Sequence, residues 1–234
     1  MPHPNILEQL REFDGPLLAN TLDFIDPTPA HERYMSGDIA SVTPQLGPTV
    51  GVAVTCRLDT SSPGGTSSME TFYETIDAIE AMAEPVVWVV EASGSRFDHE
   101  CTLGDGMAKL LYAAGCGGCV TNGRARDVAG LLTTSFATYC RGTCVHHGAL
   151  RCTALNAPVS VGGITIKPGD IIHAGAEGVI TIPPASAETL IKRAPQMRAL
   201  EHDAHCVLRR TDIKANQKQR AVAALFEKYE FTRG

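Results

Sequence analysis

The sequence has no apolar run that approaches the length of about 20 residues needed by a helix that crosses a bilayer. It has no stretch of clustered lysine and arginine that could follow a nucleic-acid backbone, and its formal net charge is -6. The first residues, Met1 to Asn5, lack the basic and apolar regions of a signal peptide. We therefore expect a cytoplasmic protein whose partners include neither a membrane nor a nucleic acid.

Internal repeats and low-complexity linkers are also absent from the 234 residues, a length that suits one large α/β domain. Hydrophobic residues make up 44% and charged residues 20% of the chain, which is an ordinary globular balance. We therefore expect a single domain over residues 1–234, in which residues 205–234 form a C-terminal helical extension.

Apolar runs of strand length alternate with segments of helical periodicity, which predicts a mixed α/β fold. The expected buried strands lie at 50–58, 86–90, 119–121 and 179–182, with a hairpin at 159–166 around Gly162-Gly163. The expected helices lie at 7–13, 17–25, after Thr66 or Ser67 as the capping residue, and at 103–114, 185–200 and 215–229. The order strand, helix, strand over 86–121 indicates a right-handed βαβ unit.

Two short charged motifs lie where ligands gather in α/β folds. Asp105 lies between two glycines at the expected beginning of a helix, where unpaired N–H groups favour an anion. Twenty residues separate it from Arg126-Asp127, and the helix and strand between them return the chain to the same edge of the sheet. Arginine offers a fork of donors to a carboxylate, and aspartate offers a hard oxygen to Mg²⁺ or Mn²⁺. The residue types alone leave open a surface ion pair at Arg126-Asp127 and a simple helix cap at Asp105.

The pattern Gly-Asp, twenty residues, Arg-Asp resembles that of the 4-hydroxy-4-methyl-2-oxoglutarate aldolases, also called the RraA-like family. The resemblance covers roughly residues 15–205 and includes the flanking segments 50–55, 157–170 and 177–183. It implies a single layered α/β domain with a swivelling-type β core flanked by helices. It also implies a homotrimer or hexamer with active sites between subunits.

The resemblance further implies a divalent-metal-dependent (class II) aldolase that cleaves a 4-hydroxy-2-oxo acid to pyruvate and a second oxo acid, with possible oxaloacetate decarboxylase activity. The residues that match the substrate site of the family are Gly104, Asp105, Gly106, Met107 and Arg126. Asp127 matches the residue that anchors Mg²⁺ or Mn²⁺. Arg126 and Asp105 are the expected catalytic residues, because Arg126 stabilises the developing enolate and Asp105 holds the water that moves the proton. Glu201 lies near the position of an acidic residue that a neighbouring subunit contributes.

The family that the sequence resembles also includes proteins with a different class of function. Some members of the family bind and inhibit an RNA-degrading nuclease without catalysis, and these can lack the second residue of the Arg-Asp pair. Asp127 is present here, which favours the enzyme. Gly175 stands where many relatives have Asp, and His146 and His147 are unusual for the family, so the exact substrate stays open. The two histidines either contact the distal part of the substrate or are surface residues, and the second interpretation is favoured.

The eight cysteines are expected to be mainly reduced thiols. Four of them have a spacing similar to that of a zinc ribbon, namely Cys116, Cys119, Cys140 and Cys144. Against a zinc site, Cys116 and Cys119 lie where a helix ends and a buried strand begins, and cysteine is readily buried as a small apolar residue. We therefore expect core packing and no structural zinc.

Overall fold

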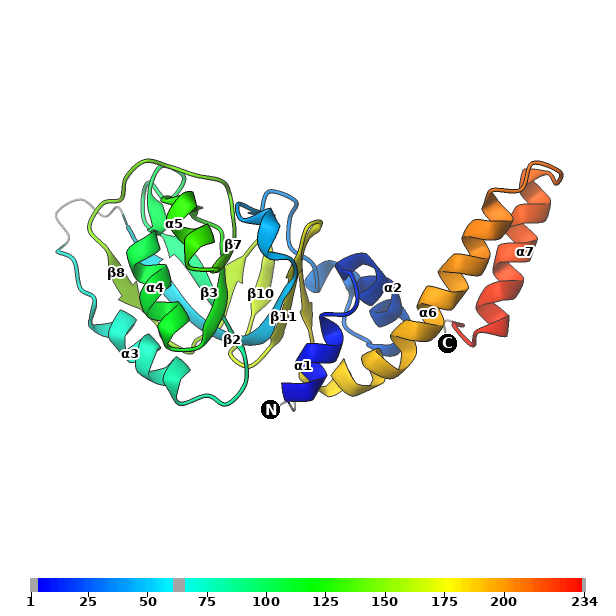
Figure 1. Ribbon diagram of the computed structural model, residues 1–234, viewed down its shortest axis with the longest axis horizontal. Coiled ribbons are helices and arrows are strands. Elements are labelled where there is room, and N and C mark those ends of the chain that lie inside the picture. Colours follow the sequence, from blue (N-terminus) through cyan, green and yellow to red (C-terminus); the bar gives the residue numbers. More distant parts are fainter. Residues whose placement is uncertain (1–3, 61–65, 233–234) are drawn as a thin grey trace.

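The protein is described by a computed structural model that covers residues 4–60 and 66–232 (Figure 1). Its main sheet has the strand order β1-β7-β5-β3-β2-β11-β12, and β8 pairs with β2 off this path. These strands are β1 (Ala40–Ser41), β2 (Thr49–Asp59), β3 (Val86–Ser93), β5 (Cys116–Thr121), β7 (Ala137–Cys140), β8 (Arg151–Thr153), β11 (Ile171–Gly175) and β12 (Gly178–Ile182). Strands β2, β3, β5 and β7 are parallel, whereas β1, β8, β11 and β12 pair antiparallel with their neighbours.

The sheet curls until its two edges are nearly joined. Beside β12, the Met35 N–H donates to the Val179 carbonyl at 2.9 Å, and Tyr34 forms a bridge to Ile180. The same stretch of chain then runs on to β1, which pairs with β7 at the opposite edge. The expected mixed α/β fold, a β core flanked by helices, is confirmed.

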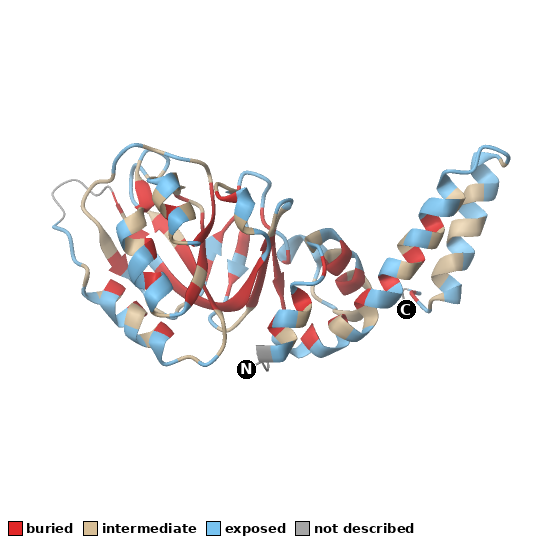
Figure 2. Ribbon diagram, in the orientation of Figure 1, coloured by how far each residue is buried: buried red, intermediate tan, exposed pale blue. Residues whose placement is uncertain are grey.

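Helices cover the sheet in two groups (Figure 1). One group consists of α3 (Glu70–Glu80), α4 (Asp105–Ala113) and α5 (Val128–Thr133). The other consists of α1 (Pro4–Leu10), α2 (Gly15–Ile25) and α6 (Ala187–Leu208), while α7 (Ala215–Lys228) packs against α6, away from the sheet. Figure 2 shows that the strands between them are buried while the outer faces of the helices are exposed. Within the described ranges, no helix has the length and apolarity needed to cross a membrane.

The continuous apolar run of β3 is explained by burial on both of its faces. Val86, Trp88 and Val90 pack in the cluster that also contains residues of α3, α4 and α5. Val87 and Val89 point the other way, into a cluster with the hairpin of β9 (Val159–Val161) and β10 (Ile164–Ile166). A strand covered on both faces has no solvent side on which polar residues would alternate.

The predicted hairpin is confirmed, and its turn shows why two glycines are present. Gly162 and Gly163 have φ values of 59° and 84°. Two successive positive φ angles are typical of a type I′ turn, which matches the twist of the strands that it joins. A Cβ atom at Gly162 would also lie only 2.5 Å from the Cβ atom of Met35.

Several predicted boundaries are wrong, each because of a contact that local periodicity does not record. The first helix ends at Leu10, and Asp14 then caps α2 by accepting from the Leu17 N–H at 2.8 Å. Neither Thr66 nor Ser67 caps α3, which begins at Glu70. Ser67 instead accepts from the Leu150 N–H at 3.3 Å.

Other boundaries move by a few residues. Leu103 belongs to the strand β4 (Cys101–Leu103), so the helix predicted from 103 begins at Asp105. Strand β5 begins at Cys116, three residues earlier than predicted. Helix α6 continues to Leu208, so residue 205, the predicted beginning of the C-terminal extension, lies inside this helix.

Candidate active site

A small two-stranded sheet brings the two charged motifs together. Strand β4 runs parallel to β6 (Arg124–Ala125), and the Arg126 N–H donates to the Leu103 carbonyl at 3.0 Å. β4 leads into Gly104 and α4, and β6 leads into Arg126-Asp127 and α5. The motifs therefore follow the carboxyl ends of adjacent parallel strands. They were expected at one edge of the main sheet, but this separate pair of strands positions them.

All the motif residues line one cavity of about 200 Å³. They are Gly104, Asp105, Gly106, Met107, Arg126 and Asp127. Gly104 is the N-cap residue of α4, so the free N–H groups of the first turn of this helix lie at the cavity. An anion is favoured at such a position by the N–H groups and by the helix dipole.

Gly104 leaves the space in which Arg126 and Asp127 lie side by side. A Cβ atom at this position would be 3.1 Å from Asp127 Oδ2 and 3.2 Å from Arg126 Nε. The two side chains are in contact, with Arg126 Nε 3.3 Å from Asp127 Oδ2, and are 31% and 44% exposed. Because both remain partly exposed, a ligand in the cavity can reach the guanidinium and the carboxylate at once.

The backbone of Asp127 adopts a left-handed conformation. Its φ of 57° and ψ of 41° lie in the left-handed region, which costs non-glycine residues about 1 kcal/mol and which aspartate tolerates better than most. Asp127 is the N-cap residue of α5, but its side chain makes no cap hydrogen bond. The carboxylate instead contacts Arg126 and stays partly exposed at the cavity.

A divalent cation fits this carboxylate. Mg²⁺ is commonly held by one or two carboxylates and takes its other ligands from water and substrate. In the described part of the chain, no group of three or more His, Cys, Asp or Glu side chains could enclose a metal ion. In the cradle at Gly104, Asp127 is the carboxylate that could hold such a cation, whose other ligands would be water and substrate oxygens.

The charged form of Asp105 is stabilised by Lys109, a residue that the sequence analysis did not predict for the site. Lys109 Nζ lies 2.6 Å from Asp105 Oδ2, and this contact holds the pKa of the Asp105 carboxyl below its usual value. On the other side, Gly130 of α5 packs so closely that a Cβ atom there would be 2.6 Å from Asp105 Cβ. The spacing of four residues on one helix was the signal that could have revealed the lysine.

The remaining wall of the cavity comes from Cys101, Thr102, Leu103, His147 and Leu150. The irregular segment 144–150 is tied to the site at three points. The Cys144 N–H donates to the Ala125 carbonyl at 3.0 Å, the Cys101 N–H donates to the His146 carbonyl at 2.9 Å, and the Leu150 carbonyl accepts from the Ser68 N–H at 2.8 Å.

His146 and His147 have different surroundings. His146 is exposed, as predicted, whereas His147 is half-buried and lines the cavity, so the surface prediction is wrong for His147. The segment has neither helical nor strand periodicity, and for this reason the sequence carried no signal of where its side chains lie.

Glu201 is not brought to this cavity within one chain. It lies in α6, far from α4 (Figure 1), and its Oε1 accepts from Asn20 Nδ2 at 2.9 Å. The family resemblance implies that Glu201 lies near the site of a neighbouring subunit, and this stays a prediction.

Four cysteines have a spacing similar to that of a zinc ribbon, and they have different surroundings. Three are buried in the core, whereas Cys144 is half-buried in the segment 144–150. Cys116, Cys119 and Cys140 are buried in β5 and β7, and burial raises the pKa of Cys116 to about 12 and that of Cys140 to about 11. A zinc ligand must be a thiolate. These surroundings favour neutral thiols that pack as apolar groups.

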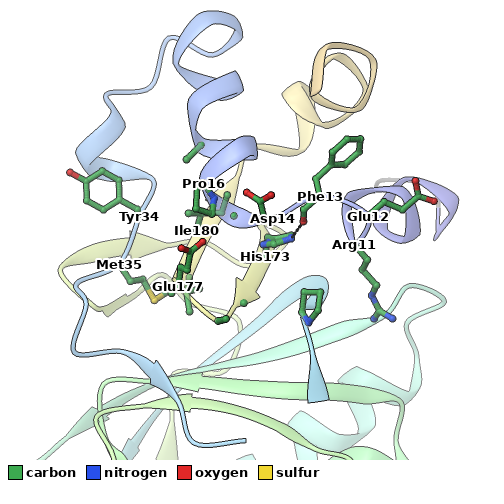
Figure 3. Close-up of a pocket in the computed structure, with 17 residues that line it drawn as sticks. Arg11, Glu12, Phe13, Asp14, Pro16, Tyr34, Met35, His173, Glu177 and Ile180 are labelled. Atoms are coloured by element: carbon green, nitrogen blue, oxygen red, sulfur yellow. Dashed lines mark hydrogen bonds between the residues drawn. The ribbon is translucent and has the colours of Figure 1, made fainter. Parts of the chain in front are cut away.

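A larger cavity of about 580 Å³ lies between the α1–α2 connection and the β11–β12 hairpin (Figure 3). Its walls include Phe13, Pro16, Met35 and Ile180, and it contains none of the motif residues. The larger cavity also holds charged groups, Arg11, Glu12 and Glu177, and the beginning of α2. The smaller cavity is the better candidate for catalysis because it contains both charged motifs, with Arg126 and Asp127 in contact beside the N-terminus of α4.

Buried His173 in this larger cavity makes the folded state sensitive to acid. Its Nε2 lies 3.0 Å from the Phe13 carbonyl (Figure 3), and burial lowers the pKa of its imidazole below 6.5. As the pH falls below about 6.5, the unfolded chain gains a proton that the folded chain resists. Stability is therefore lost down to the folded pKa, by at most about 1.4 kcal/mol per pH unit.

We expect His173→Gln to flatten this loss, which urea unfolding near pH 7 and near pH 5.5 would measure. The change in unfolding free energy between the two pH values should be smaller in His173→Gln than in the wild type. The matched control is His31→Gln, since the His31 side chain is 76% exposed. An equal loss in the wild type and His173→Gln would contradict the prediction.

The curled sheet and the paired motifs define an α/β protein whose candidate site lies at the beginnings of α4 and α5. The chain belongs to the RraA-like family, whose family model, described as Aldolase/RraA, matches residues 18–181. That match contains the whole cavity described above.

Three similar proteins place the chain within the family. It is 27% identical over 203 residues to the protein DlpA of Legionella pneumophila, an alignment that covers 85% of this chain and 31% of that protein. It is 36% identical over 122 residues to a Halalkalibacterium halodurans protein named "putative 4-hydroxy-4-methyl-2-oxoglutarate aldolase", with 48% of this chain and 53% of that protein covered. The chain thus spans only about a third and about half of these two relatives.

The third similarity is structural. The crystal structure of Streptomyces coelicolor RraAS2, described as an unusual member of the RNase ES inhibitor RraA protein family, superposes with a TM-score of 0.70 and 23% identity. The superposition covers 87% of this chain and 97% of that one. At this level of identity it shows the fold that the two proteins share.

Proposed function

We propose that the protein is a divalent-metal-dependent (class II) aldolase. It cleaves a 4-hydroxy-2-oxo acid to pyruvate and a second oxo acid, and it decarboxylates oxaloacetate to the same product. The observation that carries the proposal is the cradle at Gly104, which leaves Arg126 and Asp127 side by side at the N-terminus of α4.

Each residue of the cradle has a defined task in this reaction. The N–H groups at the beginning of α4 and the guanidinium of Arg126 bind and orient the carboxylate of the 2-oxo acid. Asp127 would hold Mg²⁺ or Mn²⁺, which supplies Lewis-acid polarisation of the 2-oxo group when bound. Arg126 also places positive charge where the enolate oxygen develops as the carbon–carbon bond breaks. Asp105, anchored by Lys109, is positioned to hold a water molecule at the cavity.

The name of the Halalkalibacterium halodurans relative supports the aldolase, although that alignment covers only 48% of this chain. The alternative is a non-catalytic regulator that binds an RNA-degrading nuclease. Its support is the shared fold of proteins described as inhibitors. The presence of Asp127 beside Arg126 favours the enzyme, because a purely protein-binding surface has no use for a strained carboxylate in a small cavity.

We further propose that the protein assembles as a homotrimer or hexamer, in which Glu201 completes the site of a neighbouring copy. The groove between α2, α6 and α7 supports this assembly. It is about 580 Å³ in volume and is lined by apolar residues such as Phe24, Leu200 and Phe226, with Glu201 among them. Light scattering of the purified protein would give the oligomeric state, and a monomer would contradict the shared site.

The function is tested by pyruvate release from 4-hydroxy-4-methyl-2-oxoglutarate and from oxaloacetate, followed with lactate dehydrogenase and NADH. We expect release that needs Mg²⁺ or Mn²⁺ and stops when the metal is chelated. Because free metal ions themselves promote loss of CO₂ from oxaloacetate, the rate at the same metal concentration without protein is the blank. If neither substrate yields pyruvate above this blank, the enzyme proposal is wrong.

A further inference from the structure

Four side chains in the motif cavity can in principle accept a proton: Cys101, Asp105, Asp127 and His147. Three of them are poorly suited to do so. Burial raises the pKa of the Cys101 thiol to about 12, which keeps it neutral and protonated. Lys109 lowers the pKa of Asp105, so this carboxylate is a weak base, and Asp127 is the proposed metal anchor. His147 is the remaining candidate for the proton acceptor, and it has no other role in the proposed reaction.

The hydrogen bonding of His147 defines which of its nitrogens is available. Nδ1 lies 2.7 Å from the carbonyl oxygen of Gly148. A carbonyl oxygen only accepts hydrogen bonds, so the ring proton of neutral His147 must be on Nδ1. Nε2 then carries a lone pair and no proton. This is the tautomer that a general base needs, with its other nitrogen oriented by a backbone acceptor.

Hydrogen bonds of the neighbouring residues also hold the backbone of His147 in place. The chain is tied to β4 by the hydrogen bond to the His146 carbonyl, one residue before it, and to Ser68 through Leu150, three residues after it. His147 lines the cavity on the wall made by this segment, whereas Arg126 and Asp127 come from β6 and its connection to α5. A substrate whose 2-oxo acid end is held by Arg126 would direct its C4 end away from Arg126, toward the remaining walls.

We propose that His147 is the general base for the C4 hydroxyl in the aldol cleavage, an inference that rests on the proposed function. Nε2 takes the hydroxyl proton, the electron pair of the O–H bond forms the C4 carbonyl of the second oxo acid, and the C3–C4 bond breaks. The electron pair of that bond becomes the enolate of pyruvate. The imidazolium releases its proton to solvent and C3 of the enolate takes one up, so protons and electrons balance.

Oxaloacetate provides an internal control, because its decarboxylation has no hydroxyl proton to remove. The C3–C4 bond of oxaloacetate breaks with loss of CO₂ and gives the same enolate. The task of His147 therefore belongs to one reaction, whereas the tasks of Arg126 and Asp127 belong to both. A base specific to the aldol reaction should change the ratio of the two activities.

The test compares wild type, His147→Gln and His146→Gln for pyruvate release from 4-hydroxy-4-methyl-2-oxoglutarate and from oxaloacetate. Glutamine keeps polarity and much of the size of histidine but accepts no proton. We expect His147→Gln to lower kcat for the aldol cleavage by about 10²-fold, the lower end of the effect of a general base. Decarboxylation should fall by less than about three-fold, a difference that a disrupted site would not produce. His146→Gln, which alters the exposed neighbour, should leave both activities unchanged.

The outcomes separate this inference from the proposed function. If His147→Gln lowers both reactions equally, or neither, the general-base role is wrong while the aldolase stands. If the wild type releases pyruvate only from oxaloacetate, the base has no reaction to serve and the role is also wrong. If the wild type releases none from either substrate, the proposed function itself fails, and the inference with it.

A second readout needs neither metal nor turnover. The ¹⁵N resonances of the imidazole in metal-free protein report which nitrogen carries the proton. For the neutral ring of His147 we expect a protonated Nδ1 and an unprotonated Nε2, assigned by comparison with His147→Gln. The opposite tautomer would remove the lone pair from Nε2 and overturn the proposal.

Discussion

Replacing Asp127 with asparagine is expected to lower kcat/KM for pyruvate release by about 10³-fold while the protein stays folded. The magnitude corresponds to the several kcal/mol of transition-state stabilisation that a catalytic metal ion supplies. Asparagine has the same shape, but its neutral amide oxygen is a much weaker ligand for a hard cation than a carboxylate oxygen. Like aspartate, it tolerates the left-handed backbone that position 127 adopts.

The physical cause of the loss is checked by measuring Mn²⁺ binding to wild type and Asp127→Asn by electron paramagnetic resonance. Thermal unfolding of the metal-free proteins serves as the control for the fold, and the two melting temperatures should be close. Weak Mn²⁺ binding together with a near-normal melting temperature would identify Asp127 as the anchor. Full activity in Asp127→Asn would show that the metal, if needed, is held elsewhere.

The parts of the fold that could be predicted from the sequence are those governed by local periodicity. The apolar run of β3 is long enough to indicate a buried strand. The glycine pair 162–163 indicates the turn of the β9–β10 hairpin, because glycine permits the positive φ angles that this turn needs. The short strands β4 and β6 have three and two residues, too few for any pattern to be visible. They are nevertheless the elements that bring the two motifs together.

The same reasoning explains which site residues were found and which were missed. Asp105, Arg126 and Asp127 were found because they belong to motifs with a fixed spacing. For His147 the sequence favoured a surface position over a substrate contact, because hydrogen bonds to residues far away in the sequence position its segment, among them the bond between His146 and Cys101. Only the three-dimensional structure shows that a histidine 20 residues beyond Asp127 lies in the same cavity.

Arg126→Lys is expected to lower kcat/KM by about 10²-fold, although the positive charge is kept. A single electrostatic donor to a developing oxyanion is worth about 10²-fold to 10³-fold in rate. Lysine offers a compact ammonium in place of a planar fork, so it cannot contact a carboxylate and a neighbouring enolate oxygen in the same geometry. Arg126→Ala, which removes the charge as well, should be less active still.

Arg124→Lys provides a matched control two residues away. Arg124 is absent from the cavity walls, and its Nη1 donates to the Arg141 carbonyl at 2.8 Å, which is a structural contact. We expect this variant to keep activity within about three-fold, as for a substitution outside the site. If Arg126→Lys loses no more activity than Arg124→Lys, the assignment of Arg126 to the oxo acid is wrong.

The way in which Arg126→Lys loses activity separates binding from catalysis. If the guanidinium only holds the substrate carboxylate, KM rises and kcat is unchanged; if it stabilises the enolate, kcat falls as well. The dianion oxalate resembles the enolate of pyruvate in shape and charge, so its inhibition constant reports the second role. We expect oxalate affinity and kcat to fall together, because the cradle at Gly104 places Arg126 Nε 3.3 Å from the proposed metal anchor, where the enolate oxygen would form.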